Sequence, residues 1–158
     1  VGSEMCIRDR FIDDEPMVVL MEACRDLGLL VLVHGGMDVS FPHCHHCTPE
    51  RIARILPRLE GLTLVLAHLG GYNYLDDVER LLVGKDLYLD TSFTLGRFGR
   101  EQILRIIRNH RPDRLLFGTD SPWDDQQSAV SAVKDLPIDA SLKDKILYEN
   151  AAGLLKLE

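Results

Sequence analysis

The sequence predicts an α/β fold, the carboxyl-terminal part of a (β/α)8 TIM barrel, with about four parallel strands and the amino-terminal strands missing. Strand-like and helix-like segments alternate four times along 158 residues, which implies parallel strands joined by helical crossovers. The strand-like runs are unbroken and apolar, as buried parallel strands are. Polar residues follow three of them. Since a whole barrel takes roughly 250 residues, half a barrel explains this spread of polar ends better than a small open sheet does.

The first unit is a helix followed by a strand. Acids and a proline at 13–16 favour a helix start. Apolar residues then follow at helical spacing, namely Leu20, Ala23, Cys24 and Leu27. Gly28 ends this helix. The apolar run 29–33 is therefore the first predicted strand, and it ends at His34.

The second unit begins with a polar loop rich in cysteine and histidine, 35–47. Thr48 is then the cap of a helix. One face of that helix is apolar and carries Ile52, Ile55, Leu56 and Leu59. Gly61 closes the helix, and the run 62–67 is the second predicted strand, which ends at His68.

The third and fourth units repeat this plan. Helices are expected before and after the run 87–92, which is the third predicted strand. Their apolar positions are Leu75, Val78, Leu81, Leu82, Ile103, Ile106 and Ile107. The run 115–119 is the fourth strand and ends at Asp120. A short helix near 129–133 and a longer one near 142–155 follow.

Composition and charge narrow the class of protein. With 18 basic and 25 acidic residues the net charge is −7, which argues against nucleic acid or an anionic membrane as partner. We expect a small-molecule substrate, and leave homo-oligomer formation open. The longest apolar runs are far shorter than the roughly 20 residues of a membrane-spanning helix. No secretory signal is recognisable, so we expect a cytoplasmic protein with reduced thiols.

Residues 1–10 differ in character from the rest of the chain. They begin at Val1 instead of Met, and no helical or strand periodicity develops up to Arg10. We interpret them as a non-native leader, although a frayed natural tail would look the same. Residues 11–158 are then expected to form one partial barrel domain.

Three predicted strand ends carry residues that bind metal ions or move protons: His34, His68 and Asp120. The carboxyl edge of the sheet is where barrel and open-sheet enzymes perform chemistry. Imidazole nitrogen and carboxylate oxygen suit zinc and related divalent ions, so His34 and Asp120 are candidate ligands. His68 is the candidate proton donor or acceptor, because histidine titrates near neutrality. One such histidine is more often structural, but the three together favour a catalytic site.

Five segments are more specific than the alternation. They are Val33-His34-Gly35-Gly36, Ala67-His68-Leu69-Gly70-Gly71, Tyr88-Leu89-Asp90-Thr91-Ser92, Phe117-Gly118-Thr119-Asp120-Ser121-Pro122-Trp123 and Glu149-Asn150-Ala151-Ala152-Gly153-Leu154-Leu155. In this order they resemble the later motifs of the amidohydrolase-related (amidohydrolase 2) family, metal-dependent barrel hydrolases and decarboxylases. The resemblance covers nearly everything from about Phe11 onward, and the segment around Asp120 is its most specific part.

The resemblance implies His34 as a metal ligand at the fifth strand, Asp120 as a ligand at the eighth and His68 as the acid-base residue at the sixth. In hydrolytic members, a metal-bound hydroxide attacks a carbonyl carbon. In decarboxylating members, the same site would instead promote the cleavage of a carbon–carbon bond. The leading hypothesis is a metal-dependent hydrolase for a small carbonyl or carboxylate compound, with zinc as the expected divalent ion, and a decarboxylase is the alternative.

The chain departs from the family pattern at its start. That pattern begins with a His-x-His pair at the end of the first strand, and nothing before Phe11 supplies one. We therefore expect the carboxyl-terminal half of a longer enzyme, with the activity in the parent protein and none in the fragment. Two donors do not replace the three protein ligands usual at a catalytic zinc.

A rival cluster is His43-Cys44-His45-His46-Cys47, in which Cys44 and Cys47 form a Cys-x-x-Cys arrangement just before a helix. That position favours metal or redox chemistry, so a Cys/His zinc-binding module is a further alternative. The second ligand pair of a structural zinc site is not apparent. The favoured interpretation is a polar loop that overhangs the active site.

Other candidates surround these residues. Asp90 and Ser92 share one face of the third strand, which could line the barrel interior near the metal, and Ser92 is predicted to bind substrate. Trp123 is predicted to wall the substrate pocket. Arg97 could neutralise a substrate carboxylate. His110 ends a helix and is expected to interact with the carbonyls of that helix.

Overall fold

The computed structural model describes residues 10–39, 43 and 45–157 and contains a parallel sheet with the strand order β1-β2-β3-β4. The strands are β1 Leu30–Val33, β2 Thr63–Leu66, β3 Tyr88–Asp90 and β4 Leu115–Leu116. The predicted α/β fold with parallel strands is confirmed. Each strand is shorter than its apolar run, because pairing extends only where the neighbouring strand lies alongside, as in the register of Val65 with Tyr88. The leader expected at 1–10 lies outside the described residues except for Arg10.

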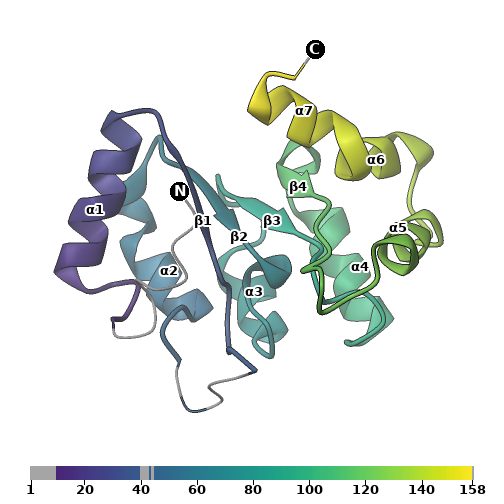
Figure 1. Ribbon diagram of the computed structural model, residues 1–158. Coiled ribbons are helices and arrows are strands. Elements are labelled where there is room, and N and C mark those ends of the chain that lie inside the picture. The colour runs from purple at the N-terminus through teal and green to yellow at the C-terminus, as the bar shows by residue number, and fades with distance from the viewer. Residues whose placement is uncertain (1–9, 40–42, 44, 158) are drawn as a thin grey trace.

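The helices separate the strands and also follow the last one. They are α1 Glu15–Asp26, α2 Pro49–Ile55, α3 Leu75–Leu81, α4 Arg100–Asn109, α5 Gln126–Lys134, α6 Ala140–Asp144 and α7 Asn150–Leu155. A wider helical turn, Lys145–Glu149, joins α6 to α7, so the long final helix predicted from the sequence is present. Figure 1 shows α1 at the end of the sheet beside β1 and the group α5–α7 at the opposite end, beside β4. Within the described part of the chain, no helix has the length and apolar character needed to cross a membrane.

The first helix buries a stripe that does not include all the apolar residues of its sequence pattern. Met17, Val18 and Met21 are buried, whereas Leu20 and Leu27 are 47% and 74% exposed. The buried stripe faces β1 and the turn 56–59, against which α1 packs. The helix predicted from the spacing of Leu20, Ala23, Cys24 and Leu27 is present, but Leu20 and Leu27 lie outside its buried stripe, because helical spacing alone does not select between two overlapping apolar stripes.

The sheet is apolar on both faces. On one face, Leu64, Leu66 and Leu89 belong to the main core, which also contains buried residues of α2, α3 and α4. On the other face, a smaller cluster of Val65, Tyr88 and Leu116 packs against Leu30, Ala151 and Leu154. Burial on both faces is the property expected of barrel strands. It also places the inner-face residues of successive strands on one surface, which continues into the loops at the carboxyl edge.

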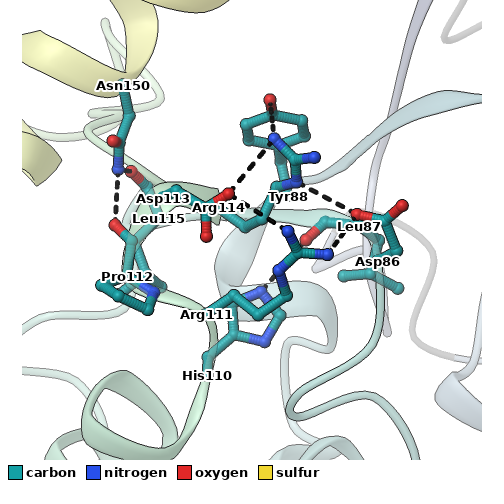
Figure 2. Close-up of polar contacts among 10 residues, drawn as sticks. All are labelled: Asp86, Leu87, Tyr88, His110, Arg111, Pro112, Asp113, Arg114, Leu115 and Asn150. Atoms are coloured by element: carbon teal, nitrogen blue, oxygen red, sulfur yellow. Dashed lines mark hydrogen bonds and ion pairs between the residues drawn. The ribbon is translucent and has the colours of Figure 1, made fainter.

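The amino ends of β3 and β4 are tied together by ion pairs (Figure 2). Arg111 and Arg114 both contact Asp86, at 2.7 and 3.1 Å, and the guanidinium of Arg114 also lies over the ring of Tyr88. Asn150 of α7 donates from Nδ2 to the carbonyl oxygens of Pro112 and Leu115, both at 2.8 Å. Asn150 therefore anchors the last helix at the edge opposite to the predicted site, where a barrel places residues that serve stability.

Candidate active site

The loops at the carboxyl edge bring two of the predicted residues into contact. His34 directly follows β1, and His68 lies two residues beyond the end of β2. Nδ1 of His34 is 3.1 Å from Nε2 of His68, and the ring centroids are 4.6 Å apart. Asp120 is exposed and acts on His34 through its charge, which favours the protonated ring. The structure thus brings the two histidines into direct contact, and Asp120 acts on His34 through its charge.

Backbone carbonyls determine which nitrogens of the two rings carry protons. Nε2 of His34 faces the carbonyl oxygen of Met37 at 3.1 Å, and Nδ1 of His68 faces the carbonyl oxygen of Ser92 at 3.0 Å. A carbonyl only accepts, so these outer nitrogens carry the hydrogens. When both rings are neutral, the two inner nitrogens face each other with lone pairs, the form of imidazole that binds a metal ion. The inner contact becomes a hydrogen bond when the pair takes up one more proton.

Burial disfavours that extra proton. The pKa of His34 lies below its ordinary value chiefly because the ring is buried, and the nearby His68 lowers it further. The carbonyl of Met37 and the charges of Asp38 and Asp120 act in the opposite direction. Near neutral pH the balance therefore favours a neutral His34, which is the state required of a metal ligand or a proton acceptor.

Glycines allow the two histidine loops to approach each other. A Cβ on Gly35 would lie 2.5 Å from the carbonyl oxygen of Ala67 and 2.7 Å from the carbonyl carbon of Gly70. Gly36 has a φ of 90°, and a Cβ there would meet the backbone of Tyr72. The glycines that follow His34 are thus required for backbone contact between the loops after β1 and β2.

Asp90 and Ser92 surround His68 from the end of β3. Oδ1 of Asp90 accepts hydrogen bonds from the backbone N–H of His68 at 3.0 Å, the backbone N–H of Ser92 at 2.9 Å and the hydroxyl of Ser92 at 2.5 Å. Both side chains are buried. Burial raises the pKa of Asp90, while the hydrogen bonds from Ser92 and His68 oppose this effect. Ser92, which is predicted to bind substrate, contacts Asp90 and His68 through its hydroxyl group in this structure.

Several backbone conformations at this edge are unusual. Non-glycine residues with positive φ occur at His68, Leu69, Asn73, Phe93 and Asp120, all in loops that follow β2, β3 and β4. For L-residues this region is unfavourable by about 1–2 kcal/mol each, and such residues tend to gather at functional sites. The same edge that carries the candidate residues therefore also carries the backbone strain.

Trp123 and Arg97 lie farther along the same edge. Trp123 is 74% exposed and lines an open pocket of about 530 Å³ formed by residues 121–126. The guanidinium of Arg97 lies 3.5 Å from the ring centroid of Phe93 and 3.8 Å from the carboxylate of Asp124. A smaller cavity of about 210 Å³ is lined in part by Phe93 and Asp124. Arg97 therefore has an acidic partner and an aromatic platform already.

The rival cysteine and histidine cluster is dispersed. Cys44 lies outside the described residues. His45 contacts the hydroxyl of Tyr74 at 2.5 Å, and His46 packs edge-on against Phe11. Cys47 is buried, and burial raises the pKa of its thiol to about 12, so the thiol is protonated.

No group of three or more histidine, cysteine, aspartate or glutamate side chains in the part of the chain that the structure describes is arranged to hold a metal ion. This holds for the described members of the rival cluster and for His34, His68 and Asp120. Catalytic zinc sites usually have three protein ligands. The donors among the described residues, taken alone, therefore do not complete a metal site.

His110 has a structural role, but a different one from that predicted. Its Nε2 donates to the carbonyl oxygen of Leu87 at 3.0 Å, and its Nδ1 accepts from the backbone N–H of Gly84 at 3.1 Å. The expectation that it interacts with carbonyls of its own helix was wrong, because α4 ends at Asn109 and the extended backbone of His110 turns the ring toward the loop before β3. Since one ring nitrogen donates and the other accepts, the His110 ring is neutral in this arrangement, and it links the end of α4 to the loop before β3.

The sequence indicated that Asp90 lies near the site, because the alternation in the segment 88–92 puts Asp90 and Ser92 on one face. It did not indicate that Asp90 binds the backbone of His68. It also gave no sign of the contact between the Met37 carbonyl and His34, because a backbone acceptor in a polar loop does not depend on a particular side chain.

Parallel strands alternate with helices in this chain, and histidines and acidic residues lie at the carboxyl edge, which is where TIM-barrel enzymes carry their active sites. A family model described as Amidohydrolase matches residues 8–157, and the chain belongs to this family. No curated protein sequence matches it. The predicted family is thereby confirmed.

Solved structures support the fold. An uncharacterised TIM-barrel protein from Bordetella bronchiseptica superposes with a TM-score of 0.76 and 27% identity, over 92% of this chain and 52% of that one. An amidohydrolase from Burkholderia multivorans with bound zinc gives 0.69 and 14%, over 93% and 59%. A dihydroxybenzoic acid decarboxylase from Polaromonas with bound manganese and 2-nitroresorcinol gives 0.64 and 18%, over 93% and 55%. The chain thus spans just over half the length of these barrels.

Proposed function

We propose that this chain supplies the later half of the active site of a metal-dependent hydrolase that acts on a small carbonyl or carboxylate compound. The observation that carries the proposal is the contact of 3.1 Å between Nδ1 of His34 and Nε2 of His68 at the carboxyl edge of the sheet. Membership of the amidohydrolase family supports it, since members are metal-dependent enzymes. The activity belongs to a complete barrel, of which this chain is about half.

In this proposal His34 and Asp120 are metal ligands and His68 is the acid-base residue. His34 is neutral near pH 7 by the balance of burial and charge, and Asp120 is exposed at the same edge. Since these donors do not complete a site, further ligands must come from outside the described residues. A divalent ion held there would polarise a water molecule or a carbonyl oxygen. Zinc is the proposed ion, and the zinc and manganese in neighbouring structures support a divalent ion in general.

His68 itself can move a proton at Nε2. Its Nδ1–H is held by the carbonyl of Ser92, so Nε2 carries the lone pair and is the atom that can accept a proton. We propose that Trp123 forms an aromatic wall of the substrate pocket, because it lines the open pocket beside Asp120.

A decarboxylase is the second candidate. It is favoured by neighbours of the same fold that decarboxylate aromatic acids, among them the Polaromonas enzyme and a 5-carboxyvanillate decarboxylase from Sphingomonas paucimobilis. Proton transfer by His68 would serve this reaction too, because the carbon that loses the carboxylate must gain a proton.

Two measurements test the proposal. The first is titration with zinc or manganese of a preparation that contains the complete barrel, because this chain spans only about half of one: His34→Ala and Asp120→Ala should each weaken binding, whereas Cys47→Ser should not. If Cys47→Ser abolished binding and the other two were harmless, the zinc-module alternative would replace this one.

The second measurement separates the two reactions in a preparation that turns over substrate. Hydrolysis places oxygen from ¹⁸O-labelled water in the product, whereas decarboxylation releases carbon dioxide and places solvent deuterium on carbon. Release of carbon dioxide without ¹⁸O incorporation would exclude the hydrolase.

A further inference from the structure

His68 does not point where the strand pattern would send it. In β2, Leu64 and Leu66 belong to the main core on the helix side, and Val65 lies on the other face. Continued alternation would turn residue 68 toward the helices. Instead, φ is 60° at His68 and 52° at Leu69, and this left-handed turn brings the ring to His34. Because L-residues disfavour such φ values, the turn needs other interactions to hold it.

The carboxylate of Asp90 supplies such interactions. Its Oδ1 accepts from the His68 backbone N–H at the start of the left-handed turn, and it also binds the backbone N–H and the hydroxyl of Ser92. Asp90 is 8% exposed and ends β3, whose residues are all buried. Its position is therefore set by the sheet, and it transmits that position to the backbone of His68.

Ser92 fixes the ring of the same residue. Its carbonyl oxygen accepts from Nδ1 of His68 at 3.0 Å. Its hydroxyl is 3.1 Å from the same nitrogen and 3.3 Å from the backbone nitrogen of His68. The backbone and the ring of one histidine are thus held by two neighbouring residues, and the carbonyl selects the tautomer that leaves Nε2 free.

The Gly-Thr-Asp segment leaves room for this arrangement. A Cβ on Gly118 would lie 3.1 Å from Cγ of Asp90 and 3.1 Å from Cβ of Ser92. The hydroxyl of Thr91 accepts from the backbone N–H of Gly118 at 3.2 Å, which keeps the two segments adjacent. A side chain at 118 would therefore press on both residues that hold His68.

We propose that Asp90 and Ser92 are the positioning residues of His68: they hold its left-handed turn and its Nδ1–H tautomer, so that Nε2 faces the interior. The consequence for proton transfer rests on the proposed function, but the positioning itself does not. Neither side chain needs to touch substrate, which gives Ser92 a different role from the predicted one.

Long-range ¹H–¹⁵N correlation spectra of the full chain, at a pH well above the ordinary histidine pKa, report the tautomer of His68. The wild type should show the Nδ1–H form in about tenfold excess, the preference expected from one hydrogen bond of ordinary net strength. Asp90→Asn keeps an acceptor oxygen and should retain this excess. Asp90→Leu has no acceptor and should move the ratio toward equal populations. Asp86→Leu, a matched change of an exposed acid, should leave it unchanged.

Ser92→Ala is the smaller change. It keeps the carbonyl but removes the hydroxyl, which donates to Asp90 and whose oxygen, 3.1 Å from Nδ1 of His68, is the second acceptor for the Nδ1 hydrogen. It should reduce the Nδ1–H excess even if Asp90→Leu fails to fold, and Gly118→Ala should do the same. An Nε2–H tautomer in the wild type would overturn the proposal, as would an unchanged excess in the folded Ser92→Ala and Gly118→Ala variants. These spectra need neither metal nor substrate, so failure of the metal titration would not affect them.

Discussion

Gly35→Ala is expected to separate the two histidine loops. The added Cβ would lie 2.5 Å from the carbonyl oxygen of Ala67, whereas ordinary contact begins at 3.4 Å, so the loops must move apart by about 0.9 Å. The nearest atoms belong to the backbone of Ala67 and Gly70, which cannot turn aside as a side chain can. Overpacking of this kind costs about 1–3 kcal/mol of unfolding free energy. A displacement of about 1 Å at reacting groups can reduce catalysis by about 10²-fold.

Urea unfolding followed by far-UV circular dichroism measures the stability, and nuclear Overhauser effects between the imidazole rings measure the contact between His34 and His68. The matched control is Gly153→Ala in α7, where nothing lies within 4 Å of the added Cβ. The control should gain up to about 1 kcal/mol from helix propensity. A Gly35→Ala variant that keeps both wild-type stability and the ring contact would refute the claim that close backbone approach joins the two histidines.

Three further predictions concern stability. Burial lowers the pKa of His110, so the unfolded chain takes up a proton at this residue more readily than the folded chain does. The unfolding free energy should therefore fall as the pH decreases below about 6.5, and it should fall less steeply in His110→Gln. Urea unfolding at several pH values measures both effects. Asn150→Ala removes two hydrogen bonds and should lower the unfolding free energy by about 1–3 kcal/mol in the same assay. The control Asn109→Ala, at an exposed position, should change it by no more than about 0.5 kcal/mol. Asp13→Ala should cost about 1.5–3 kcal/mol, because that side chain is 7% exposed and binds two arginines. Asp26→Ala should change the stability little, because the Asp26 side chain is 68% exposed. Equal effects of the two substitutions would contradict the burial argument.

The strand ends were predictable because apolar runs and glycine stops are local features. Each run ended near a polar residue, and parallel pairing then required His34 and His68 to share one edge. Their direct contact was not predictable. It depends on the positive φ of His68 and on a carboxylate 22 residues away in sequence, and neither property is encoded in hydrophobic periodicity.

The two edges of the sheet differ in how they use charge. At the amino edge, Asp86 is paired with Arg111 and Arg114, and these exposed or half-buried charges link segments between β3 and β4. At the carboxyl edge, Asp90 is buried among donors from His68 and Ser92, and strained backbone surrounds it. Exposed ion pairs contribute little stability each, so their loss is tolerable, whereas removal of a buried acceptor leaves donors unsatisfied. The carboxyl edge is therefore the more sensitive of the two to substitution, and its ordered polar contacts are better explained by the placement of His68 than by stability alone.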